Sequence, residues 1–114
     1  MGNVTPFPVA ATSARQIGFD RIELSRILDL YGRMVAAGHW KDYAIDLGKD
    51  AAVFAAFRRA SERPEYRIEK RPDLRQRQGM WALVTEAGII IKRGHDLVGV
   101  LAPIERRLLK LVGE

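Results

Sequence analysis

Cysteine is absent from the 114 residues of this sequence, which excludes disulfide bonds and thiolate chemistry. No apolar run approaches the roughly 20 residues that a membrane-spanning helix needs. Residues 1–18 also lack the basic start and the apolar run of a signal peptide. From these absences we expect a cytoplasmic protein that has no contact with a membrane. The chain is long enough to form one domain with a core of its own.

Positive charge is in excess and is concentrated in one block. The formal net charge is +5. Residues 58–77 contain eight basic and four acidic side chains, which accounts for most of that excess. Such a block attracts phosphate or an acidic protein surface. The competing interpretation is that the block is only a solvated sheet edge whose charges discourage aggregation, which is the commoner use of charged residues.

The chain is predicted to begin with a flexible tail over residues 1–18, which has two prolines and no periodic pattern. A single domain over residues 19–114 follows. Asp20 and Glu23 have the spacing of a capping box and predict a helix that ends before Gly38. Five apolar residues at helical spacing form its expected buried face: Leu24, Ile27, Leu28, Tyr31 and Val35. We expect Trp40, just beyond the helix, to cover the edge of the core.

Residues 51–59 are compatible with two structures. Their alanines, with Asp50 as a cap, favour a helix. Val53, Phe54 and Phe57, which follow a short turn, favour a strand that pairs with the one before it. We predict the strand, and we expect Phe57 to lie in the core.

Four further segments are predicted to be strands. Residues 43–47 alternate between apolar and small or polar side chains, and residues 66–70 lie between two prolines, which cannot donate to a ladder. Residues 80–85 and 89–92 form a second hairpin around a turn that contains a glycine. Because residues 89–91 are three consecutive isoleucines, we expect the last strand to be central in the sheet.

The C-terminal segment is predicted to be an amphipathic helix. Its apolar residues recur at intervals of four and three: Leu97, Leu101, Ile104, Leu108 and Leu111. Pro103 interrupts this pattern, so we expect a kink or a break near Ala102. Together these elements predict an α+β fold with an N-terminal helix, an antiparallel sheet of about five strands and a C-terminal helix, with both helices on one face. Leu101 is expected in the core.

Three segments stand out by their order and spacing: LYGRMVAAGHWKDYAIDL at residues 30–47, FRRASERPEYRIEKRP at 57–72 and IKRGHDL at 91–97. They resemble a family of small bacterial proteins, domain of unknown function 2794. The resemblance extends over roughly residues 19–112. It implies a compact bacterial domain with an uninterrupted last helix, and it implies no activity or cofactor.

The outward face of the predicted sheet is the main candidate for a binding site. If Tyr66 and Ile68 face the core, the alternate residues of their strand face outward. The candidate binding residues are basic: Arg58, Arg59, Arg67, Lys70, Arg71, Lys92 and Arg93. Phe54 and Trp81 would add aromatic contacts if they lie on this face. Such a surface suits a protein partner or a homodimer, and it also suits single-stranded nucleic acid.

A second candidate is an anion site before the last helix, where phosphate or carboxylate would meet free backbone N–H groups. Its residues are Lys92, Arg93, Gly94 and His95. The competing interpretation is that Asp96 or His95 only caps the helix, which is the more usual role. A general base at His39 or His95 would require a nucleophile, and no serine lies in a recognisable elbow. The histidines also lack zinc-ligand spacing.

We therefore predict a non-catalytic protein-binding or assembly module with no cofactor and no metal. Its expected partner is an unknown protein or a second copy of the chain. Acidic residues interrupt the arginines, which places nucleic-acid binding second. A small hydrolase that uses His39 or His95 is the remaining alternative.

Overall fold

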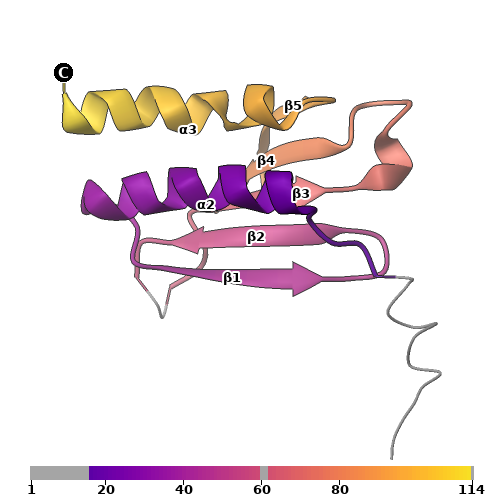
Figure 1. Ribbon diagram of the computed structural model, residues 1–114, viewed down its shortest axis with the longest axis horizontal. Coiled ribbons are helices and arrows are strands. Elements are labelled where there is room, and N and C mark those ends of the chain that lie inside the picture. Colours follow the sequence, from indigo (N-terminus) through magenta and orange to yellow (C-terminus); the bar gives the residue numbers. More distant parts are fainter. Residues whose placement is uncertain (1–15, 60–61, 114) are drawn as a thin grey trace, which may run out of the picture.

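The computed structural model describes residues 16–59 and 62–113 (Figure 1). In sequence order, one helix precedes a five-stranded sheet and a second helix follows it, and a short 3-10 helix precedes the fourth strand. The bounds are α2 Arg21–Ala36, β1 Asp42–Leu47, β2 Ala52–Phe57, β3 Tyr66–Lys70, η1 Pro72–Leu74, β4 Trp81–Thr85, β5 Ile90–Gly94 and α3 Leu97–Val112. The predicted α+β fold is confirmed. Most of the predicted tail, residues 1–15, lies outside the described residues.

The sheet is a simple meander in which neighbours in sequence are neighbours in space. Every strand pair is antiparallel, and the order is β1-β2-β3-β4-β5, so β1 and β5 are the edges. The register aligns one row of side chains across the sheet: Ile45, Phe54, Ile68, Leu83 and Lys92. Buried residues of α2 and α3 form one core with Phe54, Ile68 and Leu83 of this row. Both helices therefore cover the same face (Figure 1).

Helix α2 begins at the predicted capping box. The Asp20 carboxylate accepts from the Glu23 N–H at 2.8 Å, and the Glu23 carboxylate accepts from the Asp20 N–H at 2.9 Å. The helix buries Ile27, Leu30 and Met34. Its predicted apolar face is thus displaced to one side: Leu24, Leu28 and Tyr31 are only partly buried, and Val35 is exposed. The prediction for Val35 was wrong because the sheet lies under the neighbouring stripe of the helix.

Helix α3 buries the predicted stripe as far as Leu108, and Leu101 is in the core as expected. Leu111 is exposed because the last turns of α3 extend beyond the strands (Figure 1). The expected break near Ala102 was wrong, since the helix continues through Pro103. Val100 and Ile104, on either side of the proline, are both fully buried, and their packing offsets the single lost backbone hydrogen bond.

Residues 52–57 form a strand, which confirms the choice of strand over helix. Phe54 faces the helices and Phe57 faces away from them, so Phe57 is only partly buried and does not belong to the core. The isoleucines 89–91 lie at the β5 edge and are exposed, so the prediction of a central strand was wrong. No helix in the described part of the chain has the length and apolarity to cross a membrane.

Candidate functional site: the free edge of the sheet

The outer face of the sheet carries no helix among the described residues. Glu69 lies at its centre and is 9 % exposed. Its carboxylate lies 3.3 Å from Nε of Arg67 and 3.4 Å from Nε of Arg71. The acidic group neutralises part of the positive charge that the sequence placed here. Arg93 lies on the same face, where its Nη1 donates to the carbonyl of Gly79 at 3.3 Å.

Of the other predicted basic residues, Lys70 and Lys92 belong to the opposite face of the sheet, and Arg58 and Arg59 lie beyond the end of β2. Lys70 points toward the helices, where its Nζ donates to Glu23 at 2.7 Å and to the carbonyl of Gly18 at 2.8 Å. Lys92 is aligned with Leu83 and so belongs to the helix side of β5, although it is exposed. Arg58 and Arg59 follow β2 and are exposed. The seven candidates therefore form no single surface.

The proposed aromatic contacts are absent from the outer face. Phe54 is 0 % exposed and Trp81 is 2 % exposed, and both belong to the core. Both side chains face the helices because their strand positions share the rows of Ala52 and Ile68, which α2 and α3 cover. The prediction that they could be surface aromatics was wrong, and neither ring is available for base stacking on this face. The aromatic residue of β2 that does lie on this face is Phe57, which is partly buried.

The predicted anion site is not assembled. Lys92 and Arg93 are consecutive residues of β5 and point to opposite faces of the sheet. The Asp96 carboxylate accepts from the N–H of Gly99 at 3.1 Å and caps α3. The capping interpretation is therefore confirmed, and the helix N-terminus already holds a negative group. His95 is exposed beside it.

Within residues 16–59 and 62–113, the outer backbone groups of β1 have no backbone partner from another strand. The N–H of Tyr43 donates instead to the carboxylate of its neighbour Asp42 at 2.8 Å. The N–H of Gly48 donates to the carbonyl of Ala51 at 2.9 Å, which fixes the direction of the ladder. Backbone groups alternate in direction along an antiparallel strand. Ala44 and Asp46 therefore bond to β2, and the N–H and C=O groups of the alternate residues point away from the sheet. Those outward residues are Tyr43, Ile45 and Leu47.

The same three residues form an apolar row on the helix side of β1. Tyr43, Ile45 and Leu47 are 41 %, 39 % and 42 % exposed. The ring of Tyr43 contacts Tyr31 of α2 edge to face, with centroids 5.0 Å apart. The flank of α2 that faces β1 therefore continues the apolar row. We call this combined surface the edge site; it consists of Tyr43, Ile45 and Leu47 of β1 with Leu24, Leu28, Tyr31 and Val35 of α2.

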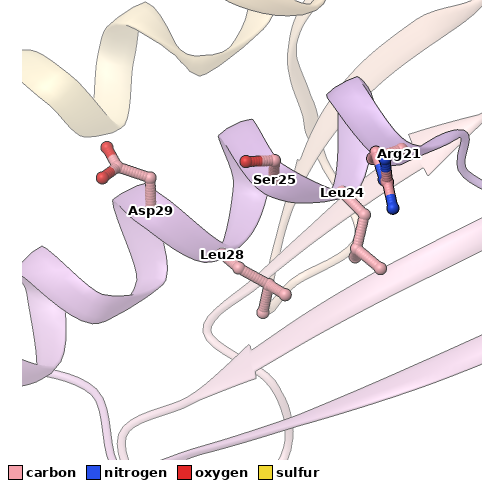
Figure 2. A pocket seen from close by; sticks show the side chains of 5 residues that line it. All are labelled: Arg21, Leu24, Ser25, Leu28 and Asp29. Carbon is pink, nitrogen blue, oxygen red and sulfur yellow. The ribbon is translucent and has the colours of Figure 1, made fainter.

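The helical part of the edge site lies beside an open hollow. Five residues of α2 line it: Arg21, Leu24, Ser25, Leu28 and Asp29. Figure 2 shows Leu24 and Leu28 pointing from the helix toward the strands, whereas Asp29 points to the other side. An apolar side chain next to β1 can therefore contact Leu24 and Leu28 without meeting the carboxylate.

The opposite edge differs from β1. Leu83 pairs with Lys92 and Val84 pairs with Ile90, so Ile91 is an extra residue, a β-bulge. A bulge bends an edge strand and disfavours pairing with another strand. Strand β1 pairs with β2 in unbroken register over all six of its residues. Of the two edges, only β1 offers a regular ladder to a further strand.

A partly buried polar cluster joins α3 to the connection between β2 and β3. Glu65 accepts from Nε1 of Trp40 at 2.8 Å and from Nη1 of Arg107 at 2.9 Å. Nη2 of Arg107 contacts Nε2 of His39. The same Nε2 lies 3.5 Å from the Glu65 carboxylate. His39 therefore belongs to this cluster, between Glu65 and Arg107.

Replacing Glu65 with glutamine is expected to destabilise the protein by about 2 kcal/mol near neutral pH. Burial alone would raise the pKa of Glu65, but the hydrogen bonds from Trp40 and Arg107 and the positive charge of Arg107 outweigh it and lower the pKa. Because the pKa of Glu65 is lower in the folded protein than its ordinary value of 4.5, the ionised carboxylate stabilises the fold at pH values above 4.5. This stabilisation is lost as the pH falls through the pKa of the folded protein. The difference between the two proteins should therefore shrink in acid.

Urea unfolding at several pH values measures this difference. Glu62→Gln is the matched control, because Glu62 lies in the same connection, is exposed, and pairs with Arg59 only at 3.4 Å. We expect that control to stay within about 0.5 kcal/mol of the wild type at every pH. A Glu65→Gln effect that is constant from neutral pH to pH 3 would contradict the assigned role of the carboxylate.

A family model described as protein of unknown function, DUF2794, matches residues 17–101. The matched segment includes α2 and all five strands. The chain belongs to the DUF2794 family. No curated protein and no solved structure matches it. The DUF2794 match thus confirms the resemblance seen in the sequence, and it includes both elements of the edge site, β1 and α2.

Proposed function

We propose that this DUF2794 protein is a non-catalytic protein-binding module whose edge site takes up an extended segment of a partner protein as a sixth strand. One observation carries the proposal: β1 is a regular edge strand whose outward backbone groups and exposed apolar side chains belong to the same residues, Tyr43, Ile45 and Leu47. In strand addition, backbone hydrogen bonds supply affinity and contacts with alternate side chains supply specificity.

Nucleic acid is the weaker candidate. Single strands are bound by stacking on exposed aromatic rings within a basic groove. Phe54 and Trp81 are buried, and Glu69 lies between Arg67 and Arg71 on the outer face. The edge site includes one half-exposed ring, Tyr43, but Asp42 and Asp46 alternate with its apolar row and oppose a phosphate backbone. Its exposed apolar row suits an extended polypeptide better.

Selection of random peptides displayed on phage against the full chain tests the proposal. We expect selected peptides to bind Ile45→Lys at least about tenfold more weakly than the wild type, because the lysine disrupts the apolar row. Ile91→Lys is the matched control, since Ile91 is also on an edge strand and is similarly exposed, at 43 % against 39 %. That control should bind like the wild type.

Recovery of no binding peptide would contradict the proposal. So would peptides that bind Ile45→Lys as tightly as the wild type, or peptides that lose affinity for Ile91→Lys instead. Circular dichroism of both variants shows whether each retains the native fold, which we expect because both positions are at sheet edges.

A further inference from the structure

The edge site has a charge pattern that would favour some extended partner segments over others according to their charge. Asp42 and Asp46 alternate with the apolar row of β1 and belong to the outer face of the sheet. The Asp42 carboxylate also accepts from the N–H of Tyr43 at 2.8 Å, so an added strand would share it with that N–H. Ala44 lies between them on that face. An added strand would therefore find a small residue flanked by two carboxylates on one face and three apolar side chains on the other. This is a local acidic site on a chain whose net charge is +5.

The direction of the backbone hydrogen bonds would bring the carboxylates of Asp42 and Asp46 close to the side chains of an added strand. Because the outward hydrogen bonds belong to Tyr43, Ile45 and Leu47, the residues between them occupy non-hydrogen-bonded positions toward an added strand. Side chains opposite each other at such positions are closer than at hydrogen-bonded ones, with Cα atoms about 4.5 Å apart. A basic side chain opposite Asp42 or Asp46 would thus form a close cross-strand ion pair.

A second copy of the chain does not suit the edge. Antiparallel pairing of two β1 strands keeps both apolar rows on one face only when residues of the same row oppose each other. One such register places Asp42 of each copy opposite Asp46 of the other, and another places the two copies of Asp46 opposite each other. Like charges directly opposite are destabilising in both of these registers. The register between them places Asp42 opposite Gly48 and Asp46 opposite Ala44, so a second copy offers neither carboxylate a basic side chain.

Resting on the proposed function, we infer that the partner segment is a basic amphipathic strand of another protein. Its sequence alternates apolar residues, which lie over Tyr43, Ile45 and Leu47, with lysine or arginine opposite Asp42 and Asp46. The position opposite Ala44 is small. The apolar residues nearest α2 extend over Leu24 and Leu28, which point toward the strands in Figure 2.

Two synthetic peptides test the inference on the full chain by fluorescence anisotropy. One has the repeat lysine-valine-alanine-valine-lysine-valine between serine flanks, and the other has glutamate in place of both lysines. We expect the wild type to bind the basic peptide about tenfold more tightly than the acidic one. Measurement at about 0.15 M salt screens the distant charges of the chain.

Charge reversal at the edge should reverse the preference. The double variant Asp42→Lys, Asp46→Lys is expected to bind the acidic peptide more tightly than the basic one. The control Asp73→Lys, Glu86→Lys changes the net charge equally at exposed positions away from β1, and it should keep the wild-type order.

The outcomes separate the inference from the proposed function. If phage-selected peptides require Ile45 but the two synthetic peptides bind equally, or not at all, the basic partner is wrong and strand addition stands. If no peptide depends on Ile45, both are wrong. Sedimentation should show a monomer, and a wild-type dimer that Ile45→Lys dissociates would overturn the inference by making a second copy the occupant.

Discussion

Replacing Phe54 with alanine is expected to destabilise the protein by about 3–5 kcal/mol, the cost of truncating a fully buried aromatic side chain. Phe54 is 0 % exposed and lies in the row that crosses the whole sheet. Its ring stacks on Tyr43 with centroids 5.0 Å apart and meets Tyr31 edge to face at 6.0 Å. The substitution therefore removes both a core residue and the support beneath one end of the edge site. Urea denaturation measures the loss.

Phe57→Ala is the control for this prediction. Phe57 belongs to the same strand, lies on the opposite face, and is only partly buried. We expect it to cost about 1 kcal/mol, the usual effect of a substitution outside the core. Equal losses for the two variants would show that the faces of β2 are assigned incorrectly.

Gly79→Ala is expected to cost at least about 3 kcal/mol, because backbone strain and a steric clash act together. Gly79 has a φ of +105°, which side chains rarely tolerate. A Cβ atom there would lie 2.5 Å from the carbonyl oxygen of Gly94 and 2.8 Å from its Cα. Both are backbone atoms of β5, so relief requires the loop after η1 to move away from the sheet.

Gly88→Ala separates the two contributions. Gly88 also has a positive φ, +85°, but a Cβ atom there meets no atom within 4 Å. We expect a loss of about 1 kcal/mol from the backbone conformation alone. Thermal unfolding of both variants tests the comparison. A Gly79→Ala protein as stable as Gly88→Ala would mean that the loop does not pack against Gly94.

The fold could be predicted from the sequence because the periodic patterns and the turn residues agree along most of the chain. Which face of β2 is buried could not be predicted from the sequence. This strand has an aromatic residue on each face, Phe54 and Phe57, so alternation identifies a strand without indicating which side is buried. The choice depends on where α2 packs, which is a tertiary property.

Charge misled the prediction at the third strand. Lysine is usually exposed, and Lys70 was therefore placed on the outer face with its neighbours. In the structure its side chain is only 12 % exposed because Glu23 and the carbonyl of Gly18 satisfy the ammonium group. Alternation along the strand places Lys70 on the same face as Tyr66 and Ile68, but its partner Glu23 lies far away in the sequence and no local pattern reveals that ion pair.

The edge site was visible in the sequence only in part. The alternation at residues 43–47 predicted the strand, but nothing in that segment indicates that it lies at an edge. The isoleucines 89–91 gave the opposite error. Their apolar run is typical of a central strand, but β5 is an edge strand with a bulge. Strand order is determined by the whole sheet.

Residue-resolved amide hydrogen exchange, with and without a phage-selected peptide, tests the central claim most directly. In the free protein we expect slow exchange at Ala44 and Asp46, which bond to β2, and fast exchange at Ile45 and Leu47. The Tyr43 N–H is left out of the comparison because it already donates to the Asp42 carboxylate. Addition of the peptide should slow the amides of Ile45 and Leu47 and leave β5 unchanged. Fast exchange at both in the presence of saturating peptide would contradict strand addition at β1.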